Sequence, residues 1–316
     1  MPSYEENILN FGKQLSFDNL VCFNLEKLVH FKPDGIVVCG MGGSGIPGDI
    51  LKKLSNELRL PVQVVIVKEG VIQKLRFKSP LFIIVSFSGE TAETLACLKQ
   101  ALAFGKGRVA VVTSGGKLYR MAREKRLPLV AFQPGDLTPR ESSGTMFFGI
   151  VKVLEAVFPL KVSPLKGLRP LHLKGLGERL AKAAKNRNIL IYTDYSFAHL
   201  GYIWKTNLNE TAKVPAFTNI YPELDHNEIA GFEKARGAWT IFWLKERSSA
   251  ALDRKIKLIS KIVGNKIDSI EIPLEGKNAQ EKTWNGVVLS HWTSLYLAKI
   301  NGVNPRETKI IDRFKK

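Results

Sequence analysis

Residues 35–45 read GIVVCGMGGSG, a run of small and β-branched residues that ends in a string of glycines. The apolar half is typical of a strand that is buried on both faces of a parallel sheet. An amphipathic stretch over residues 46–58 follows it and predicts a helix. Strand, small-residue loop and helix in this order indicate an α/β fold whose ligands bind beyond the carboxyl ends of the strands.

The same alternation of apolar runs and helical patterns continues along the chain. Helices are expected over residues 91–104 and 279–300, with a last short helix over 306–315. Further strands are predicted at residues 62–67, 81–86, 108–113, 188–193, 216–220, 240–244 and 267–272.

The length of 316 residues suits two domains of ordinary size. The stretch KVSPLKGLRPLHLKGLG, residues 161–177, is rich in Lys, Pro, Gly and Leu and is the best candidate for a linker. We therefore predict an N-terminal domain over residues 1–158 and a C-terminal domain over residues 159–316. Each is expected to be a doubly wound parallel sheet with helices on both faces.

The chain is strongly basic, with 47 Lys and Arg against 29 Asp and Glu, a formal net charge of +18. The excess is spread over both halves, and no zinc-finger spacing, RNA-binding motif or long basic run accompanies it. These features do not favour a nucleic-acid partner, because such proteins concentrate their cations where they meet phosphates. A basic surface or a site for an anionic metabolite is the simpler interpretation.

The sequence predicts a cytoplasmic protein with free thiols. No apolar run approaches 18 residues, and the first residues lack a secretion signal, so we expect no membrane span. Cys22, Cys39 and Cys97 are odd in number and widely spaced, which argues against a disulfide framework. Cys39 and Cys97 lie in apolar patterns and are expected to be buried.

A second small-residue loop, SFSGET at residues 86–91, follows another predicted strand. The hydroxyls of Ser86, Ser88 and Thr91 surround a glycine at a strand-to-helix turn. Ordinary helix capping explains one such hydroxyl but not three, so the loop predicts a cradle for a phosphate. The first loop also fits GxGxxG, with Glu69 as a candidate ribose ligand, so a nicotinamide oxidoreductase remains an alternative.

Charged side chains elsewhere could supply proton chemistry. Arg140, in TPRESSG at residues 138–144, could steer an anionic substrate or stabilise an oxyanion. Glu210 and His226 lie 16 residues apart and could act as general base and proton shuttle. No cluster of His, Cys, Asp and Glu has metal-ligand spacing, so no metal is expected, and proton chemistry of this kind requires no other cofactor.

Five strings taken together resemble the bifunctional phosphoglucose/phosphomannose isomerases, which consist of two sugar-isomerase (SIS) domains within the phosphoglucose isomerase superfamily. The resemblance covers nearly the whole chain and is most specific in the block from Glu210 to His226. The strings are GMGGSG (40–45), SFSGETAET (86–94), TPRESSG (138–144), NLNETAKVPAFTNIYPELDHNEIAGFE (207–233) and NGVNPRETKIIDRFKK (301–316).

The resemblance implies a role for each matching residue. Glu210 moves the proton between carbons 1 and 2 of the open sugar, and Arg140 stabilises the enediolate. His226 assists ring opening and reaches the site from the partner subunit of a homodimer. Lys315, on a last helix that returns to the active site, is linked to ring opening, and Thr308 to acceptance of the mannose epimer. The sugar phosphate is bound by Gly43, Ser44, Ser86, Ser88 and Thr91.

The implied activity is aldose–ketose isomerisation between fructose 6-phosphate and glucose 6-phosphate, and between fructose 6-phosphate and mannose 6-phosphate. Phe87 and Glu90 depart from the tyrosine and asparagine that are common in the family. The charge of Glu90 opposes a bound phosphate, so its side chain is expected to point outward. A non-catalytic SIS protein that senses sugar phosphates is the alternative, and it would need neither Glu210, His226 nor Lys315.

Overall fold

The computed structural model describes residues 3–160, 162, 165, 168–246, 250–264 and 267–314. The chain divides into two compact units, one spanning Asn10–Lys166 and the other Gly167–Lys316 together with Pro2–Leu9. The sequence predicted domains over residues 1–158 and 159–316. The structure differs at the N-terminus, because Pro2–Leu9 belongs to the second unit and not to the first. Residues 170–177 of the expected linker belong to helix α6 (Pro170–Ala183), which begins at a proline because the first helical position needs no N–H donor.

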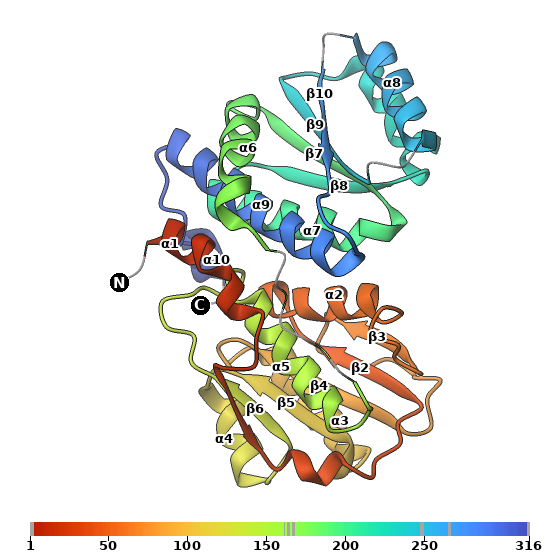
Figure 1. Cartoon of the computed structure of the whole chain (residues 1–316), viewed down its shortest axis with the longest axis vertical. Helices are drawn as coiled ribbons and strands as arrows, with labels where there is room; N and C mark the ends of the chain where they lie inside the picture. The colour runs from red at the N-terminus through yellow and green to blue at the C-terminus, as the bar shows by residue number, and fades with distance from the viewer. Residues whose placement is uncertain are drawn as a thin grey trace. The chain divides into compact units, whose positions relative to one another are not determined.

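The first unit holds a six-stranded sheet in the order β1-β6-β5-β4-β2-β3 (Figure 1). All neighbours are parallel except β1, which runs antiparallel to β6 at one edge. The four longer predicted strands of this half are present, whereas β1 and β6 were not predicted. The strands are β1 (Leu20–Phe23), β2 (Gly35–Cys39), β3 (Gln63–Val67), β4 (Pro80–Ser86), β5 (Val109–Thr113) and β6 (Leu129–Phe132).

Helices cover both faces of this sheet, which confirms the doubly wound α/β class. On one face, Gly48 of α2 (Ile46–Leu54) lies against Val38, and Gly149 of α5 (Ser143–Glu155) lies against Val112. On the other face, α3 (Ala92–Ala103) and α4 (Gly116–Glu124) share a buried apolar cluster with alternate residues of β2, β4 and β5. Cys39 and Cys97 are buried there as free thiols, whereas Cys22 is exposed.

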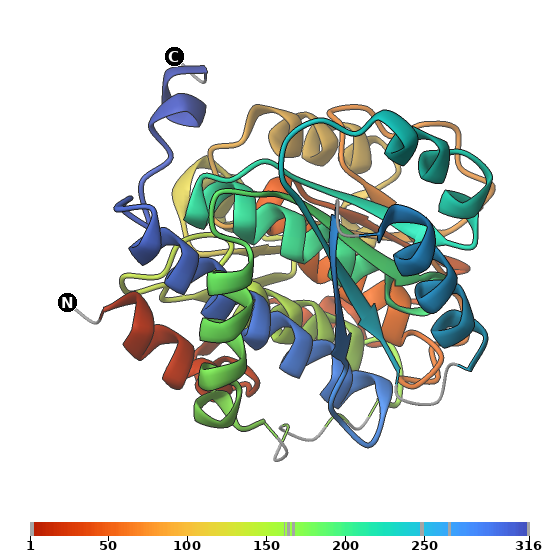
Figure 2. The same ribbon diagram turned by 90° about the horizontal axis from the view of Figure 1, so that it is seen from above.

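The second unit has a four-stranded, fully parallel sheet in the order β10-β9-β7-β8. Helix α8 (Ala250–Val263) packs on one face, and α7 (Ala198–Asn207) packs on the other, where Trp204 meets Phe242. Helix α9 (Ala279–Ile300) contacts α7, α6 and α1 (Tyr4–Leu9), as Figure 2 shows. The strands are β7 (Asn188–Asp194), β8 (Ala216–Tyr221), β9 (Trp239–Lys245) and β10 (Ile267–Pro273).

Several short elements complete the chain. Helix α10 (Lys309–Phe314) buries none of its residues and begins later than the expected residue 306. Among the described residues, no helix is long and apolar enough to cross a membrane. Short 3-10 helices span Phe11–Gln14, Leu25–Leu28, Gly42–Ser44, Lys106–Arg108, Tyr195–Phe197, Glu223–His226 and Glu228–Lys234.

Helix α1 is first in the chain yet belongs to the second unit. Its Glu5 carboxylate pairs with Lys174 of α6 at 2.7 Å and with Lys299 of α9 at 2.8 Å. Hydrogen bonds from these two ammonium groups lower the pKa of Glu5 below its ordinary value. The ion pairs therefore hold α1 on α6 and α9 only while Glu5 is ionised.

We predict that Glu5→Gln lowers the free energy of unfolding at neutral pH by about 1 kcal/mol or less, as is usual for a partly exposed ion pair. A carboxyl whose pKa is lowered by folding stabilises the protein while it is charged. The deficit should therefore shrink as the pH falls below the ordinary pKa of 4.5 and vanish below the lowered one. Urea unfolding of both proteins between pH 7 and pH 3 measures it. A deficit that stays constant over this range would contradict the assignment.

Candidate active site

Glycines allow the first loop to fold closely against its neighbours at the end of β2. A Cβ on Gly40 would lie 2.4 Å from the carbonyl oxygen of Ser44, so the turn closes only because this residue has no side chain. A Cβ on Gly43 would lie 2.9 Å from the backbone nitrogen of Arg140. The structure thus brings Gly43 and the backbone of Arg140 into contact within the first unit.

Hydroxyls join this loop to the loop that follows β4. Ser44 Oγ accepts a hydrogen bond from the Phe87 N–H at 2.9 Å. Ser86 Oγ accepts one from the Gly89 N–H at 3.1 Å and lies 3.5 Å from Thr91 Oγ1. Ser88 Oγ accepts one from the Glu90 N–H at 3.3 Å. A hydroxyl that accepts a hydrogen bond can still donate its own proton, so Ser44 and Ser88 can also donate to an anion.

The second loop packs backbone to backbone against the segment before α4. Gly89 has a φ of +68°, and a Cβ there would lie 1.9 Å from the Gly115 carbonyl oxygen. Gly116 has a φ of +71°, and a Cβ there would lie 2.2 Å from the Ser88 carbonyl oxygen. No other residue type fits either position without moving the chain, because left-handed backbone and close approach are both required.

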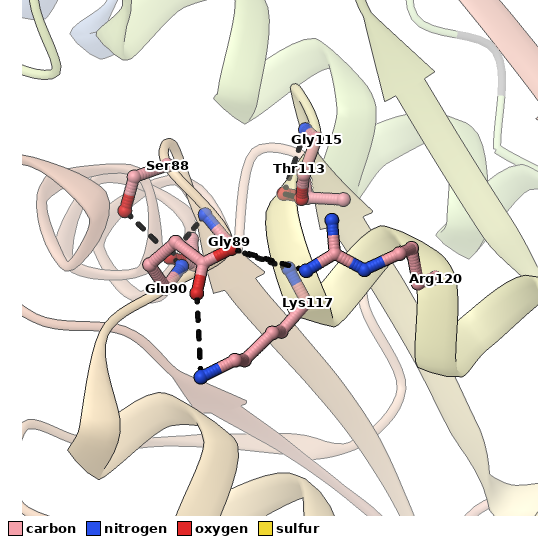
Figure 3. Close-up of polar contacts among 8 residues, drawn as sticks. Ser88, Gly89, Glu90, Thr113, Gly115, Lys117 and Arg120 are labelled. Carbon is pink, nitrogen blue, oxygen red and sulfur yellow. Dashed lines mark hydrogen bonds and ion pairs between the residues drawn. The ribbon is translucent and has the colours of Figure 1, made fainter.

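The Glu90 side chain points toward α4 (Figure 3), in agreement with the expectation that it points outward. Its Oε1 accepts the Lys117 N–H at 2.8 Å in the first turn of that helix. The Arg120 guanidinium lies 3.6 Å and the Lys117 ammonium 3.9 Å from the carboxylate oxygens. The helix N-terminus and two cations therefore compensate a charge that would otherwise oppose a bound phosphate.

Arg140 lies in the turn that precedes α5 and is only 3% exposed. Hydrogen bonds fix the turn that carries it. Ser142 Oγ donates to the Thr138 carbonyl at 3.0 Å, and Glu141 Oε2 accepts the Thr138 N–H at 3.1 Å. The Gln14 amide donates to the Glu141 carbonyl at 2.7 Å. A guanidinium remains charged when buried, so Arg140 can serve as a fixed cation.

A groove of about 960 Å³ in the second unit holds two of the predicted site residues, Glu210 and Thr308. Apolar side chains form most of its remaining wall, among them those of Phe217 and Val303. Three lysines and a second carboxylate also line the groove and were not predicted as site residues, although three of the four lie in the quoted strings 207–233 and 301–316. They are Lys205, Lys213, Lys309 and Glu307.

Glu210 is presented by a π-helical turn, Leu208–Ala212, that continues α7. Such turns are rare and occur often at functional sites. Lys213 ends the turn in the left-handed conformation, with a φ of +59°, and its ammonium donates to the Glu210 carbonyl. The widened turn leaves Glu210 partly exposed at the groove while the next residue, Thr211, is fully buried.

The remaining predicted residues lie elsewhere. His226 is exposed at the end of the 3-10 helix Glu223–His226 and is not part of the groove wall. Lys315 lies outside the described residues. Gly43, Ser44, Ser86, Ser88, Thr91 and Arg140 all belong to the first unit.

We predict that Gly89→Ala destabilises the protein more than Gly135→Ala. Both glycines have positive φ, +68° and +55°, but only Gly89 lies against backbone, whereas nothing lies within 4 Å of a Cβ on Gly135. The control, Gly135→Ala, should lower the free energy of unfolding by about 1 kcal/mol through backbone strain alone. Gly89→Ala should lower it by about 1–3 kcal/mol more, because the Gly89 loop must move away from Gly115. Equal decreases for the two variants in urea unfolding would show that Gly89 does not lie against Gly115.

The known proteins that this chain resembles include enzymes that act on sugar phosphates. A family model described as the bacterial phospho-glucose isomerase C-terminal SIS domain matches residues 174–316. The bifunctional phosphoglucose/phosphomannose isomerase of Aeropyrum pernix is 32% identical over 297 residues, which cover 89% of this chain and 88% of that protein. The D-glucosamine-6-phosphate 4-epimerase of Sulfolobus acidocaldarius is 33% identical over 67% of this chain and 66% of that protein.

The solved structure of tagatose-6-phosphate ketose/aldose isomerase from Escherichia coli shares the fold, with a TM-score of 0.69 at 14% identity. The match covers 96% of this chain and 94% of that one. The two α/β sheets and the glycine and hydroxyl loops agree with the similarity to the Aeropyrum pernix protein. The chain belongs to the family of bifunctional phosphoglucose/phosphomannose isomerases.

Proposed function

We propose that the protein is an aldose–ketose isomerase that converts fructose 6-phosphate into glucose 6-phosphate and mannose 6-phosphate, and the reverse. The observation that carries this proposal is Glu210, a carboxylate presented by a π turn at a groove. The chain also has two loops rich in glycine and hydroxyl groups. Membership of the isomerase family supports the same activity.

Phosphate binding is assigned to the loops of the first unit. Their donors are hydroxyls and backbone N–H groups, which can hold a dianion without a formal positive charge in the loop. Because the phosphate is remote from the reacting carbons, its binding energy holds and orients the sugar during the chemical step. Ser44, Ser86, Ser88 and Thr91 supply the hydroxyls, and Gly43 allows the backbone to come close.

Proton transfer is assigned to Glu210. In the open-chain aldose, the carboxylate takes the proton from carbon 2, and the electron pair of that bond forms the cis-enediolate with the carbonyl at carbon 1. The same group then returns the proton to carbon 1 while the proton of the carbon 2 hydroxyl passes to the carbon 1 oxygen, so that the carbonyl forms at carbon 2 and the ketose results. The enediolate oxygen carries negative charge, for which the buried Arg140 guanidinium is the proposed counter-charge.

Ring opening is assigned to His226 and Lys315, and acceptance of the mannose epimer to Thr308. The exposed position of His226 supports its donation from the partner subunit of a homodimer. The position of Thr308 in the wall of the groove that also contains Glu210 supports the role proposed for Thr308. We further propose that the protein acts in the cytoplasm and requires no metal or other cofactor.

Two other functions have a specific observation behind them. Epimerisation at carbon 4 of glucosamine 6-phosphate is suggested by the Sulfolobus acidocaldarius relative, whose match is shorter than that of the isomerase from Aeropyrum pernix. A nicotinamide oxidoreductase is suggested by the GxGxxG string, but its candidate ribose ligand, Glu69, accepts a hydrogen bond from Gln73 at 2.9 Å. A sugar-phosphate sensor without activity would not need Glu210.

We predict that Glu210→Gln lowers kcat for fructose 6-phosphate by about 10³-fold, within the range that general acid–base groups contribute. The amide keeps the size of the side chain but cannot take the proton. A coupled dehydrogenase assay for glucose 6-phosphate measures the rate. Glu178→Gln, an exposed carboxylate on α6, is the control and should keep the wild-type rate. Turnover that survives in Glu210→Gln would remove Glu210 from the mechanism.

We also predict that Thr308→Gln narrows the enzyme toward glucose 6-phosphate. The longer side chain would crowd carbon 2, where glucose and mannose differ, so kcat/KM for mannose 6-phosphate should fall about tenfold relative to glucose 6-phosphate. Thr308→Ser keeps the space and should keep the ratio. An unchanged ratio in Thr308→Gln would contradict the role of this residue.

A further inference from the structure

We propose that a buried hydrogen-bond cluster of Tyr4, Thr211 and His291 positions Glu210 for proton transfer, an inference that rests on the proposed function. The Tyr4 hydroxyl lies 3.0 Å from His291 Nδ1 and 3.3 Å from Thr211 Oγ1. Thr211 directly follows Glu210 in the π turn. The cluster therefore joins the turn to α1 and to α9.

All three side chains are removed from water. Tyr4 is 5% exposed, His291 1% and Thr211 not at all. In such a low-dielectric setting hydrogen bonds are strong, and losing one partner leaves a buried polar group unsatisfied. The cluster can therefore resist a displacement of the turn that a surface contact would allow.

The π turn needs such contacts because its geometry is uncommon and it is followed by a left-handed residue. Other residues tie down its two ends. Asn207 Nδ2 donates to Ser290 Oγ at 2.7 Å, and Asn301 Nδ2 donates to the Ala212 carbonyl at 3.1 Å. The Thr211 hydroxyl holds the residue that follows Glu210, and the Lys213 ammonium donates to the Glu210 carbonyl itself. Thr211 is buried and Glu210 borders the groove, so fixing one side chain orients the other.

Loss of the Thr211 hydroxyl should therefore lower kcat more than it alters KM. Small displacements of a catalytic group can cost about 10²-fold in rate, because proton transfer depends on short distances and alignment. Substrate affinity is assigned to the phosphate loops of the first unit, which this change does not touch. Tyr4, Thr211 and His291 are positioning residues on this account, and helix α1 contributes to activity through Tyr4.

The test is Thr211→Val in the full-length protein, with Thr283→Val as a matched control. Thr283 is equally buried in the same unit, and its Oγ1 contacts an imidazole nitrogen, His199 Nε2, at 3.1 Å. We expect kcat for fructose 6-phosphate to fall at least about tenfold in Thr211→Val with KM within about twofold. Thr283→Val should stay near wild type, and Thr211→Ser, which restores the hydroxyl, should recover most of the rate. Tyr4→Phe should reproduce the loss.

Hydrogen exchange of residues 208–214 gives a readout that does not depend on activity. Exchange should speed up in Thr211→Val and Tyr4→Phe and stay unchanged in Thr283→Val. Unchanged exchange in this segment, or an equal loss of kcat in Thr283→Val, would overturn the positioning role. A wild-type protein without isomerase activity would instead contradict the proposed function, while the exchange experiment would still decide whether the cluster holds the turn.

Discussion

Close backbone approach at glycine is the constraint on which the first unit depends. Gly43 lies against the backbone of Arg140, and Gly89 lies against the Gly115 carbonyl, at distances that no Cβ permits. This packing gathers the serine and threonine hydroxyls of two loops beyond the carboxyl ends of β2 and β4. It also holds the Glu90 side chain against α4. There the N-terminus of the helix and the cations of Lys117 and Arg120 compensate the charge of Glu90. An uncharged set of donors is thereby left for the proposed phosphate site.

In the second unit the main structural feature is the support of one carboxylate, that of Glu210, beside an open groove. A π turn presents Glu210, and its neighbours anchor the turn to α9 and to the N-terminal helix. Rigid support of this kind suits the role proposed for Glu210, which is to remove and return one proton. Lysines around the groove would add positive charge near the proposed anionic substrate, which would give part of the +18 net charge a local use.

Sequence patterns predicted the long buried strands, because alternating helices and β-branched runs mark a parallel sheet. They also placed the glycine and hydroxyl loops after β2 and β4, whose binding of phosphate stays a prediction. They missed β1 and β6, which have only four residues each, and the helical start at Pro170. The packing of α1 on the second unit, the π turn and the groove lysines could not be predicted, since tertiary contacts decide them. Glu210 and Thr308 line one groove, and their roles stay predictions, as do those of His226 and Lys315.

The most direct test of the central claim is an NMR analysis of the products that wild-type protein forms from fructose 6-phosphate in D₂O. Proton transfer by an exchangeable carboxylate through an enediolate predicts glucose 6-phosphate and mannose 6-phosphate, both carrying deuterium at carbon 2. Aldose products without any deuterium at carbon 2, or no aldose product at all, would contradict the account.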